Sequence, residues 1–359
     1  MRTYLVTGGA GFIGSNFVYY MFRKYGDDIR LINVDALTYA GNLENLKGIE
    51  DRKNYTFIKA DIRNKEAIEK IFAENDVDVV VHFAAESHVD RSIVNPEVFV
   101  ETNVLGTAVM LNAAKAAWEN EGGSFKDGKK FLHVSTDEVY GSLSDPKDYF
   151  YETTPYDPHS PYSASKASAD FLVKAYVDTY HFPACITNCS NNYGPYQFPE
   201  KLIPLIINNA LSGKKLPVYG DGKNVRDWLY VDDHCKGIDM VIEKGRVGEK
   251  YNIGGHNERE NIQIVKTIIK TLQEILPNDD PRKANVSEDL ITYVEDRKGH
   301  DRRYAIAPDK ISKELGWLPD TKFEDGIRLT IKWYMDHLDW MENITSGDYQ
   351  DYYKRMYRI

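Results

Sequence analysis

The sequence predicts an α/β protein with a doubly wound parallel sheet and a smaller C-terminal α+β lobe that binds substrate. Through residue 192, short apolar segments alternate with helical patterns, as in parallel sheets covered by helices on both faces. A glycine cluster joins the first apolar segment to the first helical pattern, and the alternation loosens from residue 193. We therefore expect one domain over residues 1–192 and a second lobe mainly over residues 193–359, with strands and helices free to interleave between them.

Strand and helix patterns follow one another regularly in the first half. Residues 77–82 are almost continuously apolar, which is typical of a strand buried on both faces. Apolar residues three or four positions apart mark the helices. The expected strands are residues 4–7, 29–34, 55–59, 77–82, 130–135 and 184–187, and the expected helices begin at residue 12 or span 65–74, 96–120 and 160–180.

The second half is less regular. Short strand patterns at residues 218–219, 230–231 and 251–253 stand among separate helices and Gly-Pro pairs. We assign these segments to the smaller lobe. The tail from Asp339 is rich in Asp, Trp and Tyr, and we expect it to pack across a surface.

Composition excludes several classes of protein. The 359 residues carry a net charge of −10, which argues against general nucleic-acid binding. No apolar run approaches the roughly 20 residues that span a membrane, and a strand pattern begins close to Met1, so we expect a cytoplasmic protein without a signal peptide. Cys185, Cys189 and Cys235 form neither a disulfide framework nor a paired metal motif, so we expect buried thiols and no metal.

Gly8, Gly11 and Gly14 stand three residues apart where the first strand meets the first helix. Glycines at this junction allow a tight turn, close approach of a pyrophosphate and close helix packing, and the N–H groups of the helix start bind phosphate charge. Asp35 ends the second strand about 20 positions later, where an acidic residue bonds ribose hydroxyls. Because Asp35 repels a 2′-phosphate and residues 36–38 include no arginine, we expect NAD rather than NADP. The alternative is a glycine-rich turn without a ligand.

Tyr162 and Lys166 are four positions apart and therefore share one face of a helix. An isolated tyrosine, with a pKa of about 10, is a poor base at neutral pH. A nearby ammonium and a positively charged nicotinamide would favour the tyrosinate, which could accept a hydroxyl proton while hydride passes to NAD. The alternative is an ordinary Tyr–Lys pair on a solvated helix.

Several of these features together resemble one enzyme family. Residues 7–14, residues 83–86, Asn103, Ser135 and the Tyr162–Lys166 pair resemble the extended short-chain dehydrogenases/reductases, which act largely on nucleotide-linked sugars. The likeness runs nearly end to end and implies a Rossmann fold.

Two adjacent carboxyls, Asp137 and Glu138, follow Ser135 and Thr136 at a strand end. They narrow the resemblance to a smaller group of enzymes within this family. Eliminating water from a sugar requires both an acid and a base, and neighbouring carboxyls can divide these roles because like charges separate their pKa values. The alternative is a solvated loop or a helix N-cap.

The paired carboxyls occur with further motifs at residues 88–92, 191–195, 224–228 and 296–301. Together they resemble the dTDP-glucose 4,6-dehydratases. One departure is Lys298, which stands where this family commonly has proline and puts the rigidity of that loop in doubt. Arg226 and Arg297 also suit an anionic substrate, because arginine forks match phosphate oxygens; the alternative for each is a surface salt bridge.

The resemblance implies that the chain converts dTDP-glucose to dTDP-4-keto-6-deoxyglucose and water, with bound NAD, in deoxysugar supply such as dTDP-rhamnose for polysaccharide. It implies that Tyr162, assisted by Lys166, takes the O4 proton and that Thr136 bonds O4. Glu138 would remove the C5 proton and Asp137 would protonate the departing C6 hydroxyl. A homodimer formed through helices 96–120 and 160–180 is also implied.

The candidate contacts fall into two sets. For NAD they are Gly8, Gly11, Phe12, Ile13, Gly14, Asp35, Ala36, Leu37, Thr38, Asp61, Ile62, Phe83, Ala84, Ala85, Glu86, Ser87, Thr102, Ser135, Tyr162, Lys166 and Asn192. For the substrate they are Ser87, His88, Thr136, Asn191, Glu200, Lys201, Leu202, Pro217, Tyr219, Arg226, Asn261, Asp296, Arg297 and His300.

Two other functions are compatible with parts of this pattern. A nucleotide-sugar 4-epimerase would need Tyr162 and a rotating ketone but would leave Asp137 and Glu138 without a role. A non-catalytic NAD-responsive binding protein would not need Tyr162 and Lys166 in register. The residues leave open whether thymidine or uridine is preferred and which final sugar is made.

Overall fold

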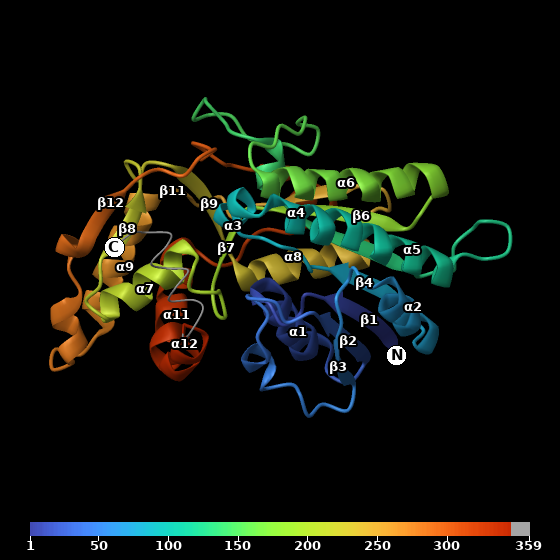
Figure 1. Ribbon diagram of the computed structural model, residues 1–359, viewed down its shortest axis with the longest axis horizontal. Coiled ribbons are helices and arrows are strands. Elements are labelled where there is room, and N and C mark those ends of the chain that lie inside the picture. Colours follow the sequence, from blue (N-terminus) through green and yellow to red (C-terminus); the bar gives the residue numbers. More distant parts are fainter. Residues whose placement is uncertain (346–359) are drawn as a thin grey trace.

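A seven-stranded parallel sheet forms the centre of the computed structural model, which describes residues 1–345 (Figure 1). Its strand order is β10-β6-β5-β4-β1-β2-β3, and every neighbouring pair is parallel. The strands are β1 (Arg2–Thr7), β2 (Ile29–Asp35), β3 (Tyr55–Lys59), β4 (Val79–His82), β5 (Lys130–Thr136), β6 (Ala184–Cys189) and β10 (Lys250–Ile253). The predicted doubly wound sheet is confirmed, and the carboxyl ends of its strands meet at one edge, where such folds bind ligands.

Helices cover both faces of this sheet (Figure 1). On one face α1 (Phe12–Tyr25) packs against α8 (Val231–Lys244), and their apolar side chains join one core. The other face carries α2 (Lys65–Glu74), α5 (Thr107–Trp118) and α6 (Pro161–Tyr180), which enclose a second core. Burying each large apolar side chain contributes about 1.5–3 kcal/mol, so these two cores hold the sheet edge, and the residues beyond it, in place.

The long helix expected at 96–120 is divided. The chain forms α3 (Val89–Val94), α4 (Pro96–Phe99), a π-helical segment η2 (Val100–Gly106) and then α5. Pro96 starts a new helix because its ring fixes φ and removes an N–H donor. Within η2, the Asn103 side chain accepts from the Glu86 N–H at 2.8 Å and donates to the Glu86 carbonyl at 3.0 Å. The π-helical segment therefore lies where the chain is fastened to the loop after β4.

A smaller set of strands and helices lies beside the carboxyl edge of the sheet (Figure 1). Its core is formed mainly by α7 (Leu202–Leu211), α9 (Asn261–Ile275) and α11 (Phe323–Asp336). Its strands are β7 (Asn191–Tyr193), β8 (Leu216–Tyr219), β9 (Val225–Tyr230), β11 (Glu258–Glu260) and β12 (Ile291–Val294). Its helices are α7 (Leu202–Leu211), α9 (Asn261–Ile275), α11 (Phe323–Asp336) and α12 (Leu338–Ile344). The remaining short helices are η1 (Leu43–Leu46), η3 (Asp137–Tyr140), η4 (Pro281–Asn285), η5 (Glu288–Leu290) and α10 (Asp309–Leu315), of which η4 and η5 pack in the smaller lobe.

Two expectations for the second half are corrected. Val231 begins α8 instead of ending a strand, and Asp232 and Asp233 follow in the first turn of that helix, where negative charge interacts favourably with the helix dipole. The strand at 251–253 does not belong to the smaller lobe, because β10 pairs with β6 in the large sheet. A three-residue strand pattern carries no signal of which sheet the strand joins.

The C-terminal tail packs on the molecule as far as it is described. Trp340 in α12 is buried, and its indole N–H donates to Asn45 Oδ1 at 2.8 Å. The rest of the expected surface tail, residues 346–359, lies outside the described residues. Within residues 1–345, no helix has the combined length and apolarity needed to cross a membrane.

Candidate active site

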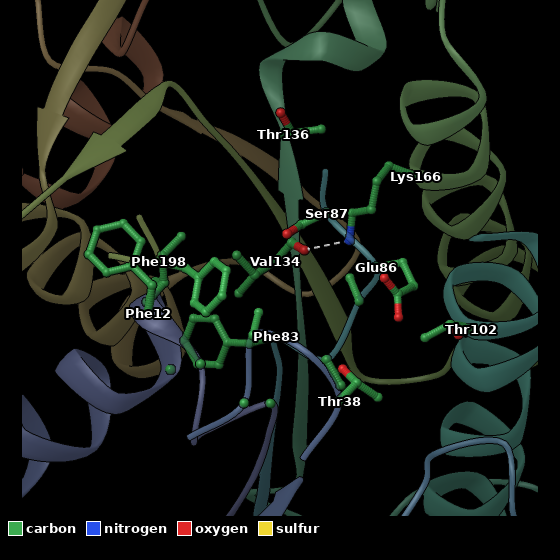
Figure 2. Close-up of a pocket in the computed structure, with 18 of the residues that line it drawn as sticks. Phe12, Thr38, Phe83, Glu86, Ser87, Thr102, Val134, Thr136, Lys166 and Phe198 are labelled. Carbon is green, nitrogen blue, oxygen red and sulfur yellow. Dashed lines mark hydrogen bonds between the residues drawn. The ribbon is translucent and has the colours of Figure 1, made fainter. Parts of the chain in front are cut away.

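Two adjoining cavities lie at the carboxyl edge of the sheet. The larger, of about 370 Å³, follows the strand ends (Figure 2), and the smaller, of about 160 Å³, extends between the sheet and the second lobe. They share the lining residues Glu138, Asn191, Asn192, Gln197, Glu200 and Lys201. One continuous site therefore has Glu138 at the junction of its two parts.

The glycine turn lines the larger cavity and tolerates no side chain at two positions. Gly8 has φ +73°, and a Cβ there would lie 2.7 Å from the Ala84 nitrogen. A Cβ on Gly14 would lie 2.2 Å from the Gly8 carbonyl oxygen. Gly11 caps α1 without a side-chain hydrogen bond, so the first N–H groups of the helix can bind a phosphate. This cradle fits the pyrophosphate of a dinucleotide.

Asp35 lies beside the same turn. Its carboxylate accepts from the Ala10 N–H at 3.0 Å and from the Leu37 N–H at 2.8 Å. Burial raises the pKa of Asp35, and these two main-chain bonds oppose that rise. Arg63 also lines the cavity, but its guanidinium is bonded to Asp61 at 2.7–3.1 Å. A negative group for ribose hydroxyls and an already paired arginine fit NAD, as predicted.

We expect Gly14→Ala to weaken NAD binding roughly ten- to a hundredfold, because overpacking at backbone contact costs about 1–3 kcal/mol. NAD retained through purification and calorimetric titration of stripped protein measure the loss. Gly26→Ala, at the other end of α1, is the matched control: it has φ +54° but no atom within 4 Å of an added Cβ. It should lower stability and leave NAD affinity unchanged; equal NAD affinity in both variants would contradict the cradle.

The two adjacent carboxyls occupy a 3₁₀ turn directly after β5. Thr136 caps this turn, since its hydroxyl accepts from the Glu138 N–H at 3.2 Å and donates to Asp137 Oδ1 at 3.3 Å. Asp137 is only 1% exposed, and its Oδ2 has no hydrogen-bond partner among the described residues. Glu138 is partly exposed and lines both cavities. The expected alternative of a solvated loop is therefore excluded for Asp137.

The surroundings of these two carboxyls differ in charge. Burial raises the pKa of Asp137 well above its usual range, and the carboxyls of Glu138 and Asp227 add to the rise. Burial also raises the pKa of Glu138, but three cations, Arg297, Arg226 and Lys201, oppose it. The site thus favours a protonated Asp137 beside a more easily ionised Glu138, which is the arrangement that an acid and a base require.

Tyr162 and Lys166 project from the start of α6 into the larger cavity. A capping box between Ser160 and Ser163 fixes this helix start. The Lys166 ammonium donates to the Val134 carbonyl at 2.9 Å (Figure 2). Burial raises the pKa of Tyr162 well above its usual value and lowers that of Lys166. In the protein alone, burial therefore outweighs the predicted effect of the ammonium on the tyrosine.

Basic side chains gather in the smaller cavity. Arg226 in β9 donates to the main-chain oxygens of Val225 and Asp301 at 2.8 and 2.9 Å and lies 4.1 Å from the centre of the Tyr304 ring. Arg297 Nε is buried without a hydrogen-bond partner in the described chain, and its nearest carboxylate oxygen, on Asp90, is 4.0 Å away. Within residues 1–345 neither arginine forms a surface salt bridge, so both remain suited to an anionic ligand.

Nearly all predicted contacts come together. Every expected NAD contact except Leu37 lines the larger cavity, including Thr102 on η2 (Figure 2). Every expected substrate contact except Asp296 lines one cavity or the other. Leu37 lies outside the lining with φ 55°, and its N–H holds Asp35. Asp296 is exposed and bonds His300 Nδ1 at 2.6 Å, so it contacts a lining residue instead of lining the cavity.

Several lining residues were not predicted. Asp90 and Trp228 lie inside quoted motifs, and Ser190 follows a strand end, so the sequence carried a signal for them. Phe198 and Tyr304 come from loops far along the chain, and the sequence carried no signal for them. Figure 2 shows Phe198 near Phe12 and Phe83 on one side of the larger cavity. The remaining unpredicted side chains include Arg63, Val98, Val134, Cys189, Gln197 and Leu205.

Comparison with known proteins agrees with this geometry. A family model described as GDP-mannose 4,6 dehydratase matches residues 5–330. A dTDP-glucose 4,6-dehydratase of Shigella flexneri is 53% identical, over 98% of both chains. The Bacillus anthracis dTDP-glucose 4,6-dehydratase, solved with NAD, shares 49% identity with a TM-score of 0.84, over 96% of this chain and 100% of that one. The Streptomyces venezuelae enzyme of the same name, solved with NAD and a dTDP ligand, shares 44% identity with a TM-score of 0.86 and the same coverage.

The matched regions include both lobes of the chain and the residues that line both cavities. They confirm the resemblance that the glycine turn, the Tyr162–Lys166 pair and the adjacent carboxyls indicated. The chain belongs to the GDP-mannose 4,6 dehydratase family.

Proposed function

We propose that this chain converts dTDP-glucose to dTDP-4-keto-6-deoxyglucose and water with tightly held NAD. The observation that carries the proposal is the pair Asp137 and Glu138, placed where the cofactor and substrate cavities meet and held in unlike electrostatic surroundings. A 4-epimerase or a non-catalytic binding protein would have no chemical role for two adjacent carboxyls. The relatives named dTDP-glucose 4,6-dehydratase support the same substrate.

The first step oxidises C4 of the sugar. NAD held by the glycine turn and Asp35 would supply the oxidising chemistry, as hydride acceptor for C4 and hydride donor for C6. Tyr162 Oη takes the proton of the O4 hydroxyl, and Thr136 Oγ1 bonds that oxygen. Lys166 adds positive charge on the same helix face, which favours the tyrosinate when the positive nicotinamide is also present.

The second step removes water. The C4 ketone makes the C5 proton acidic, and Glu138 accepts it as base. Asp137 donates a proton to the departing C6 hydroxyl, which leaves as water. The hydride removed at C4 ends at C6, and Glu138 returns a proton, exchanged with solvent, to C5, so no external oxidant or reductant is consumed. Arg226, Arg297 and Lys201 hold the diphosphate and favour the ionised form of Glu138.

Incubation with dTDP-glucose and UDP-glucose in parallel tests this function. We expect dTDP-glucose to give a product lighter by one water, with deuterium at C5 when the solvent is D₂O. A product of unchanged mass would instead indicate a 4-epimerase, and absence of turnover with bound NAD would indicate a binding protein. Release of one NADH per sugar would contradict an internal transfer of hydrogen.

The product is a precursor of deoxysugars, and we place the chain in cytoplasmic supply of compounds such as dTDP-rhamnose for polysaccharide. A nucleotide-sugar substrate suits that compartment. The three cysteines, Cys185, Cys189 and Cys235, are buried free thiols, which suits it as well.

We also infer a homodimer formed through the outer face of α3, η2 and α6. These segments pack side by side (Figure 1), and they expose Val94 (79%), Val100 (55%), Leu105 (54%) and Phe171 (61%). Apolar patches that are gathered in this way mark protein interfaces. The double substitution Val100→Glu/Phe171→Glu should give monomers by light scattering. Leu329→Glu, an equally exposed leucine on α11, should leave the assembly intact; a parent protein that is already monomeric would contradict the inference.

A further inference from the structure

Asp170 extends the catalytic face of α6 by one more turn. Tyr162, Lys166 and Asp170 are spaced four residues apart, so their side chains follow one another along one side of the helix. Asp170 is 1% exposed and does not line either cavity. A carboxylate this deeply buried requires hydrogen-bonding or charged partners. The proposed mechanism gives Asp170 no role.

Its partners come from three other segments. Asp170 Oδ2 accepts from Ser135 Oγ at 3.0 Å, from Tyr156 Oη at 2.7 Å and from Asn188 Nδ2 at 3.3 Å. Oδ1 lies 3.3 Å from His133 Nε2. Ser135 and Asn188 are register neighbours on β5 and β6. The carboxylate therefore ties α6 to the ends of the two strands that lead into the active site, one residue before Thr136.

The same carboxylate is the anion that faces Lys166. The groups around this ammonium are His82 of β4, His133 of β5, Cys189 of β6 and Asp170 itself. Tyr162 on the same helix and Asp137 and Glu138 of η3 line the same cavity. Burial lowers the pKa of both imidazoles and raises that of the thiol, so these three are uncharged at neutral pH.

Asp170, by contrast, stays ionised. Burial raises its pKa, but the nearby His133 imidazole, the Lys166 ammonium and the Tyr156 hydroxyl lower it on balance. Among the described groups, Asp170 is the charged group that attracts the Lys166 ammonium most strongly. Lys166 is itself only 4% exposed, so without a facing negative charge burial would favour its neutral form.

We propose that Asp170 is a positioning residue that keeps Lys166 charged and fixes the register of α6, so that Tyr162 and Lys166 face the cofactor cavity together. Its kinetic consequence rests on the proposed function, whereas its effect on Lys166 does not. The side chain acts through Lys166 and the strand ends and does not touch the substrate.

Direct titration of Lys166 tests this role. In holoenzyme with ¹³Cε-labelled lysine, the Lys166 resonance is the one missing from Lys166→Arg. We expect Asp170→Asn, which keeps the shape and removes the charge, to lower the Lys166 pKa by about one unit or more. Because a neutral Lys166 no longer favours the tyrosinate of Tyr162, the pH at which kcat/KM rises should move upward. Asp170→Glu should restore most of the profile.

Asp239→Asn is the matched control. Asp239 is a fully buried carboxylate on α8 that accepts from Tyr25 Oη at 2.9 Å and Tyr20 Oη at 3.2 Å, away from both cavities. This variant should lose stability without moving the Lys166 titration. A Lys166 pKa unchanged in folded Asp170→Asn would overturn the proposal.

A second measurement covers the case in which Asp170→Asn does not fold. If the carboxylate compensates the buried ammonium, Lys166→Met/Asp170→Asn should be more stable than Asp170→Asn alone, because both charges are then absent. Thermal unfolding of the two proteins decides this, and an unrescued double variant would overturn the proposal. Should the parent protein fail to dehydrate sugars while Lys166 still responds to Asp170, the proposed function fails and this inference stands.

Discussion

Glu138→Gln is expected to lower the rate of water elimination by about 10²- to 10⁴-fold, the usual contribution of a positioned acid–base group. The amide keeps the size of the side chain but cannot accept the C5 proton. Oxidation at C4 depends on Tyr162 and should persist, so absorbance of reduced nicotinamide should build up on the enzyme after dTDP-glucose is added. Rapid-mixing absorbance and product mass follow the two steps separately, and deuterium uptake at C5 should stop.

The control for this variant is Glu152→Gln. Glu152 is a partly buried carboxylate that accepts from the Asn252 N–H at 2.9 Å and lines neither cavity. Its loss should affect stability without separating the two steps. Normal product formed at the parental rate by Glu138→Gln would remove Glu138 from the role of base. Loss of both steps together would place it in substrate binding instead.

The parallel sheet was predictable because its signals are local. Each strand from 4–7 to 184–187 is an apolar run flanked by a helical pattern, and the observed strands differ from the expected ones only at their ends. Parallel strands put their carboxyl ends at one edge, so the residues after each strand were candidates before any contact was known. That rule alone brings Gly8, Asp35, Glu86, Thr136 and Asn191 into one site.

Elements that depend on distant packing were not predictable. The strand at 250–253 has too few residues to show whether it borders β6 or joins the smaller lobe. The π-helical turn in 100–106 coincides with the hydrogen bonds between Asn103 and the main chain of Glu86, and a helical pattern in the sequence does not record such a contact. Phe198 and Tyr304 enter the cavities from loops whose course is set by the second lobe.

The division of roles between Asp137 and Glu138 could likewise be predicted only in part from the sequence. Adjacency in sequence predicts that the two pKa values separate but not which group keeps the proton. The structure supplies the direction, because Asp137 is enclosed while Glu138 faces Lys201, Arg226 and Arg297. Those three cations come from segments 60 or more positions away along the sequence. Only the folded chain brings them to one carboxylate.

Tyr162→Phe should suppress the first step and, with it, everything that follows. Removing the base for the O4 proton is expected to lower turnover by about 10²- to 10⁴-fold, and no absorbance of reduced nicotinamide should appear after mixing with dTDP-glucose. This absence distinguishes the variant from Glu138→Gln, in which that absorbance accumulates. NAD content should match the parent, because the aromatic ring and its packing against Phe99 remain.

Tyr251→Phe is the control for Tyr162→Phe. It distinguishes the loss of a catalytic hydroxyl from the loss of stability that removing a buried hydroxyl causes. Tyr251 is fully buried, and its hydroxyl accepts from the Arg246 N–H at 3.1 Å and donates to Glu314 at 3.0 Å, outside both cavities. It should unfold at a lower temperature and turn over normally.

Since burial raises the pKa of Tyr162 in the protein alone, activity of the parent enzyme must depend on positive charge that arrives with the cofactor or is held on Lys166. Lys166→Met should therefore reproduce the loss in Tyr162→Phe at neutral pH and regain activity as pH rises; a variant with full activity at neutral pH would show that the tyrosine ionises without it.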